Sequence, residues 1–155
     1  MSTSPPAVHL VVRYRDPEPS VRTIERHREV LDAHGAVWFG KVGKTLGEQW
    51  TEAIRAQVAA GTDTYLYLAA RPKNQLVIHR GQVAHITRSR PSNGHLIPEY
   101  YLQLGLEPDI SFWTLVQSLD EVPEEGLRDL VVASSQRPVL ESLRSSAPIL
   151  VVRAR

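Results

Sequence analysis

Two amphipathic segments, residues 21–34 and 46–60, each lie between short apolar runs, and this order limits the folds open to the chain. Their apolar side chains recur at helical spacing, as Val21, Ile24, Val30 and Leu31 in the first segment and as Leu46, Trp50, Ile54 and Val58 in the second. Ser20 precedes the first segment as a predicted N-cap, and a glycine follows each segment, where helices commonly end in a left-handed residue. We therefore expect two helices that each bury one apolar face.

The apolar runs around these helices have the length and composition of strands. They cover residues 8–14, 36–42, 64–70, 75–88, 110–119, 130–133 and 148–152. Residues 71–74 join two of them as a hairpin, and residues 138–143 predict one helical turn. The order of strand, helix, strand, helix and then mainly strands predicts an α+β fold, in which a curved sheet or barrel is flanked by two main helices.

At 155 residues the chain has the length of one domain, which we place at residues 7–155 after a flexible tail at residues 1–6. The chain contains no cysteine, which excludes disulfides, thiolate metal sites and a cysteine nucleophile, and fits a reducing compartment. Its apolar stretches are far shorter than the roughly 20 residues of a membrane-spanning helix, and the N-terminus lacks a signal-peptide pattern. We expect a cytoplasmic domain without a membrane partner.

Positive and negative charges are nearly balanced, with eighteen Lys and Arg against seventeen Asp and Glu and a net charge of +1. A surface that binds nucleic acid must therefore be local, because the whole molecule attracts a polyanion only weakly. Basic residues are dense between Arg71 and Arg90, and acidic residues between Glu107 and Asp129. This asymmetry predicts one basic face, with a charged, solvated strand edge as the alternative.

Residues 40–45 (GKVGKT) resemble the end of a phosphate-binding P-loop, because Gly-Lys-Thr lies between a strand and a helix. A P-loop needs a further glycine five positions before the second one, so that backbone N–H groups can surround the phosphates. Trp38 stands at that position, and its indole would crowd the loop. We therefore do not expect nucleotide hydrolysis.

The six histidines do not have the spacing of a metal site. His27 and His34 are seven residues apart without an acidic partner at ligand spacing, and His79 and His85 are six apart on one predicted strand. The latter two share the same parity, which predicts that both side chains lie on one solvated face of the sheet. We expect no metal and no cofactor.

From residue 35 onward, the order of motifs resembles the YTH domain. The pattern begins with a strand that contains Gly-x-Trp, a polar loop and a helix. An apolar strand, a turn and a strand with glycine before alternating apolar residues follow. A strand ending in tryptophan and a late turn complete the pattern. The strands and turns of this pattern are residues 35–41, 65–68, 71–74, 80–86, 110–113 and 135–139. Since EVE and ASCH modules share this plan, the chain resembles the YTH/EVE branch of the PUA-like superfamily, which implies a PUA-like curved sheet or barrel.

The resemblance implies a module that reads a modified, methylated base flipped into an aromatic pocket. Trp38 would form one wall and a ring from residues 91–103 the second, where tyrosines stand in place of the family's tryptophan. A core position is the alternative for Trp38 and Trp113. The base-pocket candidates are Trp38, Tyr14, Asp16, Tyr100, Tyr101 and Trp113, and the phosphate-contact candidates are Arg15, Lys41, Lys44, Arg71 and Lys73.

The leading hypothesis is therefore a binding module without catalytic residues, whose partner is nucleic acid, DNA rather than RNA, with a modified base. It would serve as the specificity domain of a modification-dependent restriction or phage-defence system, with a nuclease or an ATPase as partner. One alternative is a small enzyme that acts on a nucleotide or another small molecule through Asp16, Lys41 and His95. The other is a protein-interaction domain whose tryptophans all lie in the core.

Overall fold

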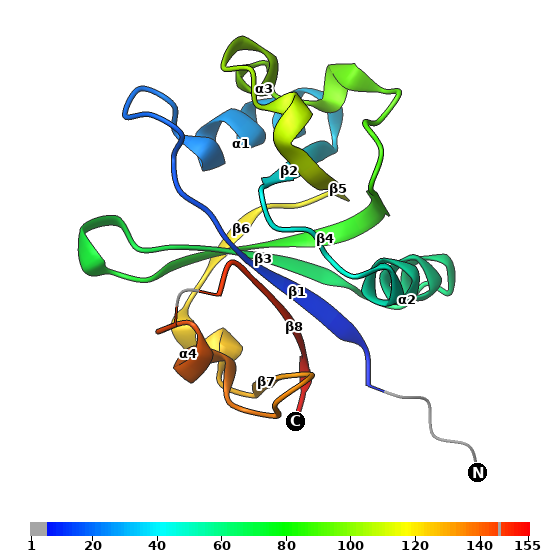
Figure 1. Ribbon diagram of the computed structural model, residues 1–155, viewed down its shortest axis with the longest axis vertical. Coiled ribbons are helices and arrows are strands. Elements are labelled where there is room, and N and C mark those ends of the chain that lie inside the picture. Colours follow the sequence, from blue (N-terminus) through cyan, green and yellow to red (C-terminus); the bar gives the residue numbers. More distant parts are fainter. Residues whose placement is uncertain (1–5, 146) are drawn as a thin grey trace.

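A curved, mixed sheet forms the frame of the fold, which a computed structural model describes for residues 6–145 and 147–155 (Figure 1). Strands β1 (Val8–Arg13) and β3 (Tyr65–Ala70) pair in parallel at its centre, and the other strand pairs of these residues are antiparallel. The remaining strands are β2 (Val37–Val42), β4 (Val77–Thr87), β5 (Ile110–Val116), β6 (Asp120–Val122), β7 (Leu130–Val132) and β8 (Ile149–Ala154). They lie in the order β2-β5-β4-β3-β1-β8-β7, with β6 beside β4.

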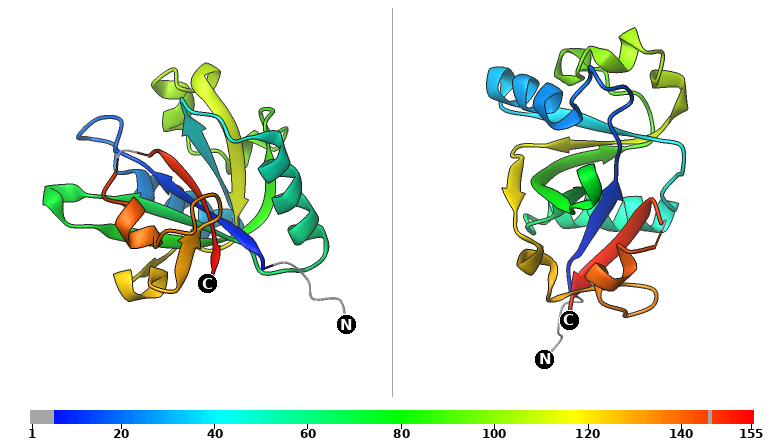
Figure 2. Two further views of the ribbon diagram at one scale, coloured as in Figure 1. Left: turned by 60° about the horizontal axis from the view of Figure 1, so that its bottom comes forward. Right: turned by 90° about the vertical axis from the view of Figure 1, so that its left-hand side faces the viewer.

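Four α-helices pack around this sheet in the described part of the chain. The longer two, α1 (Thr23–His34) and α2 (Glu48–Ala59), confirm the predicted helices, whereas α3 (Tyr100–Gln103) and α4 (Val139–Ser142) each form a single turn. Helices α1 and α3 lie at one end of the sheet and α4 at the other, with α2 on one side (Figure 2). Across residues 6–145 and 147–155, every helix falls short of the length and apolarity needed to cross a bilayer.

The architecture confirms the predicted α+β class, with a curved sheet and two main helices. The sheet is not closed into a barrel, because no pairing among the described residues joins its two edge strands, β2 and β7. The predicted strands and the hairpin at residues 71–74 are present, with bounds shifted by a few residues. The predicted tail at residues 1–6 lies outside the described residues, except for Pro6.

Helix α1 begins later than predicted and without Ser20 as its N-cap. The backbone N–H of Thr23 donates instead to Oδ1 of Asp16 at 3.0 Å, which satisfies one of the free N–H groups of the first turn. Ser20 donates its hydroxyl to Oε1 of Glu18 at 3.1 Å. The prediction for Ser20 is wrong because the chain turns back between β1 and α1 and brings the carboxylate of Asp16 to the helix end.

Strand β4 bends where its register against β5 shifts between Val83 and His85. The irregularity changes which face alternate side chains of the strand occupy, so that His79 is only 9% exposed whereas His85 is exposed. His79 also faces Glu121 in the pairing of β4 with β6, a short strand that the sequence patterns did not predict. The prediction that both histidines lie on one solvated face is therefore wrong.

Three apolar clusters form the interior of the described residues. The first joins the sheet to α1 and α2, the second joins β1, β3 and β8 to α4, and the third joins β2 and β5 to the segment that ends in α3. Along β1, Leu10 and Val12 belong to the first cluster and Val11 to the second. The central strand is thus apolar on both faces, as expected for a strand covered on both sides.

Candidate binding cleft

An open cleft of about 1390 Å³ lies beside the carboxyl ends of the parallel strands β1 and β3. Its lining comes from the β1–α1 segment (residues 13–19), the end of β2, the β3–β4 turn, the region of α3 and the turn before β8. The β1–α1 segment and the β3–β4 turn both project on the left side of Figure 1. Because small-molecule pockets usually measure roughly 300–1,000 Å³, this cleft has room for a ligand larger than a typical metabolite.

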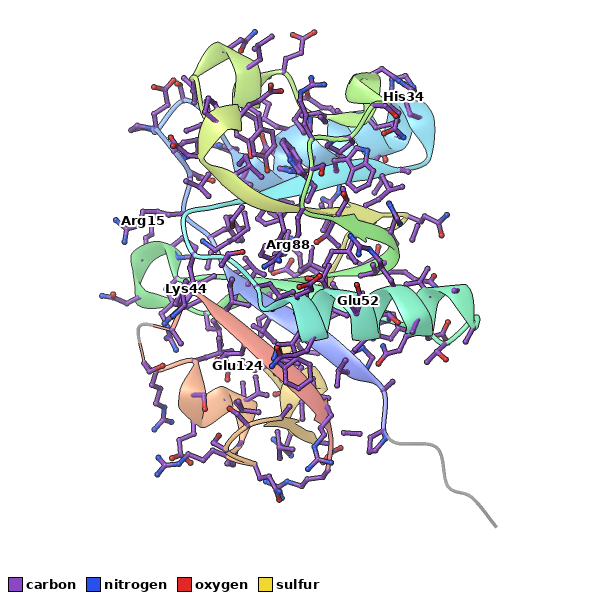
Figure 3. The ribbon with its side chains drawn as sticks, turned by 45° about the vertical axis from the view of Figure 1, so that its right-hand side comes forward. Arg15, His34, Lys44, Glu52, Arg88 and Glu124 are labelled. Carbon is purple, nitrogen blue, oxygen red and sulfur yellow. The ribbon has the colours of Figure 1, made fainter. Side chains whose placement is uncertain are left out.

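Most of the residues predicted for the site line this one cleft, although they come from separate segments of the chain. They are Tyr14, Arg15, Asp16, Lys41, Arg71, Tyr100 and Tyr101. Figure 3 shows Arg15 reaching outward from the β1–α1 segment. The predicted residues that do not line the cleft are Trp38, Trp113, Lys44 and Lys73.

Trp38 lies on the covered face of β2 rather than in an open pocket. It is 3% exposed, and its Nε1 donates to Oδ1 of Asn93 at 2.9 Å. Trp113 is equally enclosed and packs against Tyr101, with ring centroids 5.3 Å apart. Because side chains alternate along a strand, Phe39 joins the cluster under α1 and α2, while Trp38 faces the segment before α3, which covers it. The prediction that Trp38 forms a wall of an open pocket is wrong, and so is the place of Trp113 among the base-pocket residues. Both tryptophans have the core position that was the alternative.

Tyr100 and Tyr101 form the floor of the cleft as stacked, buried rings with centroids 4.4 Å apart. The hydroxyl oxygen of Tyr101 accepts the N–H of Gly40 at 3.0 Å and lies 3.1 Å from Nε2 of His27. Since Nδ1 of His27 donates to the Thr23 carbonyl at 2.7 Å, Nε2 can accept the tyrosine proton. Burial raises the pKa of Tyr100 to about 12 and that of Tyr101 well above its usual value, so both phenols are neutral.

Tyr14 offers a more accessible ring than these two tyrosines. Its side chain is half-buried against the first core cluster, and its backbone N–H donates to the Ala69 carbonyl at 3.0 Å. Burial and, after it, the nearby charge of Asp16 raise the pKa of Tyr14 to about 12. The phenol therefore stays protonated at neutral pH and keeps a hydrogen-bond donor at the cleft.

Basic side chains outnumber carboxylates in the lining of the cleft. The basic residues are Arg13, Arg15, Lys41, Arg71 and Arg144, and the acidic ones are Asp16 and Glu18. None of these basic groups forms an ion pair within residues 6–145 and 147–155. Burial lowers the pKa of Lys41, whose Nζ donates to the Val42 carbonyl at 2.9 Å. The excess of positive charge suits an anionic ligand.

Two arginines of the lining, Arg13 and Arg144, were missing from the predicted site. Arg13 lies at the end of a strand and carries no motif, and Arg144 lies in a turn far along the chain. The pairing of β1 with β8 brings the two together. The sequence alone does not indicate this contact, because the contact depends on the pairing of β1 with β8.

Lys44 and Lys73 are exposed outside the cleft lining. The loop that carries Lys44 is held by the hydroxyl of Ser111, which lies 3.0 Å from the carbonyl of Lys41 and 2.8 Å from that of Lys44. This segment, which resembles part of a P-loop in sequence, thus has its backbone carbonyls fixed by β5. Because both lysines lie outside the cleft, a ligand held there is not expected to reach them, and the phosphate contacts predicted for Lys44 and Lys73 do not extend to this cleft.

His95, which the enzymatic alternative combines with Asp16 and Lys41, does not line the cleft. Its ring packs against that of His34, with centroids 5.4 Å apart, at the end of α1. The three residues are therefore not brought together in this geometry.

Asp16 combines a structural hydrogen bond with a place in the cleft lining, and two substitutions separate these roles. Asp16→Ala removes the acceptor for the Thr23 N–H and should lower the free energy of unfolding by about 1 kcal/mol. Asp16→Asn keeps an acceptor oxygen and should cost clearly less. Urea denaturation of the three proteins measures the difference, and an alanine variant as stable as the wild type would show that this cap contributes nothing.

The curved sheet with helices at its ends, together with a basic cleft formed by loops beside it, defines a small α+β domain with an open cleft among its described residues. A protein-family model described as Pua-like matches residues 10–145, and the chain belongs to this family. The match confirms the PUA-like superfamily that the sequence motifs indicated. No curated protein and no solved structure matches the chain. PUA-like domains are commonly modules that bind nucleic acid.

Proposed function

We propose that this chain binds nucleic acid through the cleft and holds one unstacked nucleotide inside it. The observation that carries the proposal is the gathering of basic side chains around the half-buried ring of Tyr14, in a chain whose net charge is only +1. Proteins bind single strands with basic groups that follow the phosphates and aromatic rings that stack on bases. Both kinds of group line this cleft, and membership in the Pua-like family supports the same function.

Tyr14 and Asp16 are the residues proposed to contact the base. Stacking of a base on an aromatic ring contributes about 1–3 kcal/mol. The carboxylate of Asp16 can accept a hydrogen bond from an exocyclic amino group, as cytosine and adenine carry it. Arg15 and Lys41, which line the same cleft, are proposed to neutralise phosphates.

We propose further that the cleft distinguishes a methylated base from an unmodified one, as the resemblance to YTH and EVE modules implies. Because Trp38 is enclosed, Tyr14 takes its place as the stacking ring in this proposal. A methyl group buried in the cleft would add about 0.8 kcal/mol, which is about fourfold in affinity. A preference for DNA and a role beside a nuclease or an ATPase in restriction rest on the sequence resemblance alone.

Fluorescence anisotropy with labelled single-stranded DNA and RNA, methylated and unmodified, tests these proposals. Lys41→Gln should weaken binding and reduce the slope of log affinity against log salt by about 0.7 for the phosphate contact that it loses. Lys44→Gln removes the same charge from the neighbouring loop outside the cleft and should change neither. Tyr14→Ala should cost about 1–3 kcal/mol of binding free energy, whereas Tyr14→Phe keeps the stacking ring.

Each part of the proposal fails on a different result. If no oligonucleotide binds, or if the Lys41 and Lys44 variants lose affinity equally, the cleft is not a nucleic-acid site. If methylated and unmodified strands bind equally well, only the base-reading part is lost. Tighter binding of RNA than of DNA would correct the preference taken from the resemblance.

A further inference from the structure

Arg13 fastens the turn that carries Arg144 to the end of β1. Its guanidinium donates to the backbone carbonyls of Leu143 and Ser145, the two residues that flank Arg144. The backbone N–H of Arg13 also donates to the carbonyl of Pro148 at 2.9 Å, just before β8. These hydrogen bonds fix the backbone of Arg144 beside the cleft.

Arg71 approaches the same end of the cleft from the turn after β3. Arg13 pairs in parallel register with Ala69, which precedes Arg71 by two positions. Burial and, after it, the nearby positive charge of Arg71 lower the pKa of Arg13. Arg71 and Arg144 are exposed and line the cleft. Three cationic groups therefore gather where β1 and β3 end.

These three arginines form no ion pair with a carboxylate in the described residues, although arginines elsewhere in the fold do. Arg137, for comparison, lies 3.7 Å from Glu141 on α4. Repulsion among grouped cations raises the free energy of the empty cleft, and a bound anion would relieve it. Phosphate suits such a group because guanidinium forks bind its oxygens through parallel hydrogen bonds.

We infer that Arg71 and Arg144 bind one phosphate group of the ligand, and that Arg13 is a positioning residue that holds Arg144 in place. The inference rests on the proposed function and deepens it, because it gives the direction in which the nucleotide lies. The phosphate occupies the end of the cleft at Arg71, and the base occupies the end at Tyr14 and Asp16. The ligand is then a phosphate-bearing nucleotide or strand, and a nucleoside without phosphate binds about tenfold more weakly.

Oligonucleotides in which one phosphodiester at a time is replaced by a neutral methylphosphonate test this subsite. The wild type should lose about tenfold in affinity when one particular linkage is neutral. Arg71→Gln and Arg144→Gln should lose a similar amount on the natural strand and nothing further on that modified strand. Lys73→Gln in the same turn and Arg137→Gln just before α4 remove the same charge outside the cleft and should behave as the wild type, and equal melting temperatures verify folding.

The role of Arg13 is tested by combining substitutions. If Arg13 acts through Arg144, then Arg13→Gln alone weakens binding, whereas adding it to Arg144→Gln causes no further loss. A merely structural role would make the two losses add, and that result would overturn the positioning role.

Inorganic phosphate separates this inference from the proposed function. In a nuclear magnetic resonance titration, phosphate but not chloride at equal ionic strength should shift the backbone amides of residues 69–71 and 143–145, and Arg71→Gln should abolish the shifts. If oligonucleotides bind and depend on Lys41 but are indifferent to Arg71 and Arg144, the subsite is wrong and the nucleic-acid function stands. If phosphate shifts these amides but no oligonucleotide binds, the subsite stands and the nucleic-acid function is wrong. If phosphate causes no shifts and no oligonucleotide binds, both proposals are wrong.

Discussion

Gly81→Ala is expected to lower the free energy of unfolding by about 3 kcal/mol, which corresponds to roughly 6–12 °C in Tm. A Cβ atom at this position in β4 would lie 2.7 Å from the backbone carbonyl oxygen of Ser118 and 2.9 Å from the side chain of Val116. A backbone carbonyl cannot move aside as the end of a flexible side chain can, so β4 would have to shift against β5. Thermal and urea denaturation measure the loss.

Gly126→Ala provides the matched control for this substitution. The nearest atom to a Cβ there is Cβ of Val122 at 4.0 Å, which is an ordinary contact. Its stability should therefore stay within about 0.5 kcal/mol of the wild type. If Gly81→Ala were as stable as this control, the close approach of β4 to residues 116–118 would not require glycine at position 81.

Stability is also expected to fall by about 3 kcal/mol as the pH decreases from 6.5 to about 4, through the titration of His27. The unfolded chain binds a proton at this residue near pH 6.5, whereas burial in the folded chain lowers the pKa of His27 to about 4. Between these values the unfolded state holds more protons, so stability rises with pH. Well above pH 6.5 none of this stability is lost, and well below about pH 4 all of it is lost.

His27→Gln removes the titrating group while its amide can still form hydrogen bonds to the Thr23 carbonyl and the Tyr101 hydroxyl. Urea denaturation of both proteins at a series of pH values should give a flatter profile for the variant. A residual slope is expected from His9 and His79, because burial lowers the pKa of each of them as well. Parallel profiles for wild type and variant would show that His27 is not the source of the acid sensitivity.

The two long helices and most strands were predictable because their burial requires regular spacing of apolar residues along the chain. Strand β6 was not, since its three residues include Asp120 and Glu121 and it forms by pairing with residues 78–80 of β4. The irregularity in β4 has no local signal either. One shift in register was enough to place His79 in the interior and to make its predicted exposure wrong.

The candidate site was predictable where it depends on position along the chain. Tyr14, Asp16 and Arg71 follow strand ends, and the ends of the parallel strands β1 and β3 meet at the cleft. The position of Trp38 depends on something else, namely which face of β2 the segment before α3 covers. Strand periodicity gives the two faces of a strand without saying which one is covered by a distant segment. Arg144 was missed for the related reason that only tertiary pairing brings its turn to the cleft.

The cleft is built from segments near both ends of the described chain, residues 13–19 and the turn before β8. A molecule that binds there links the first strand to the last, so its binding energy resists opening of the whole fold rather than of one loop. A ligand at a hundredfold excess over its Kd raises the free energy of unfolding by about 2.7 kcal/mol. Natural ligands can therefore be sought among unlabelled cellular nucleotides and nucleic-acid fragments by the rise in melting temperature that each one causes.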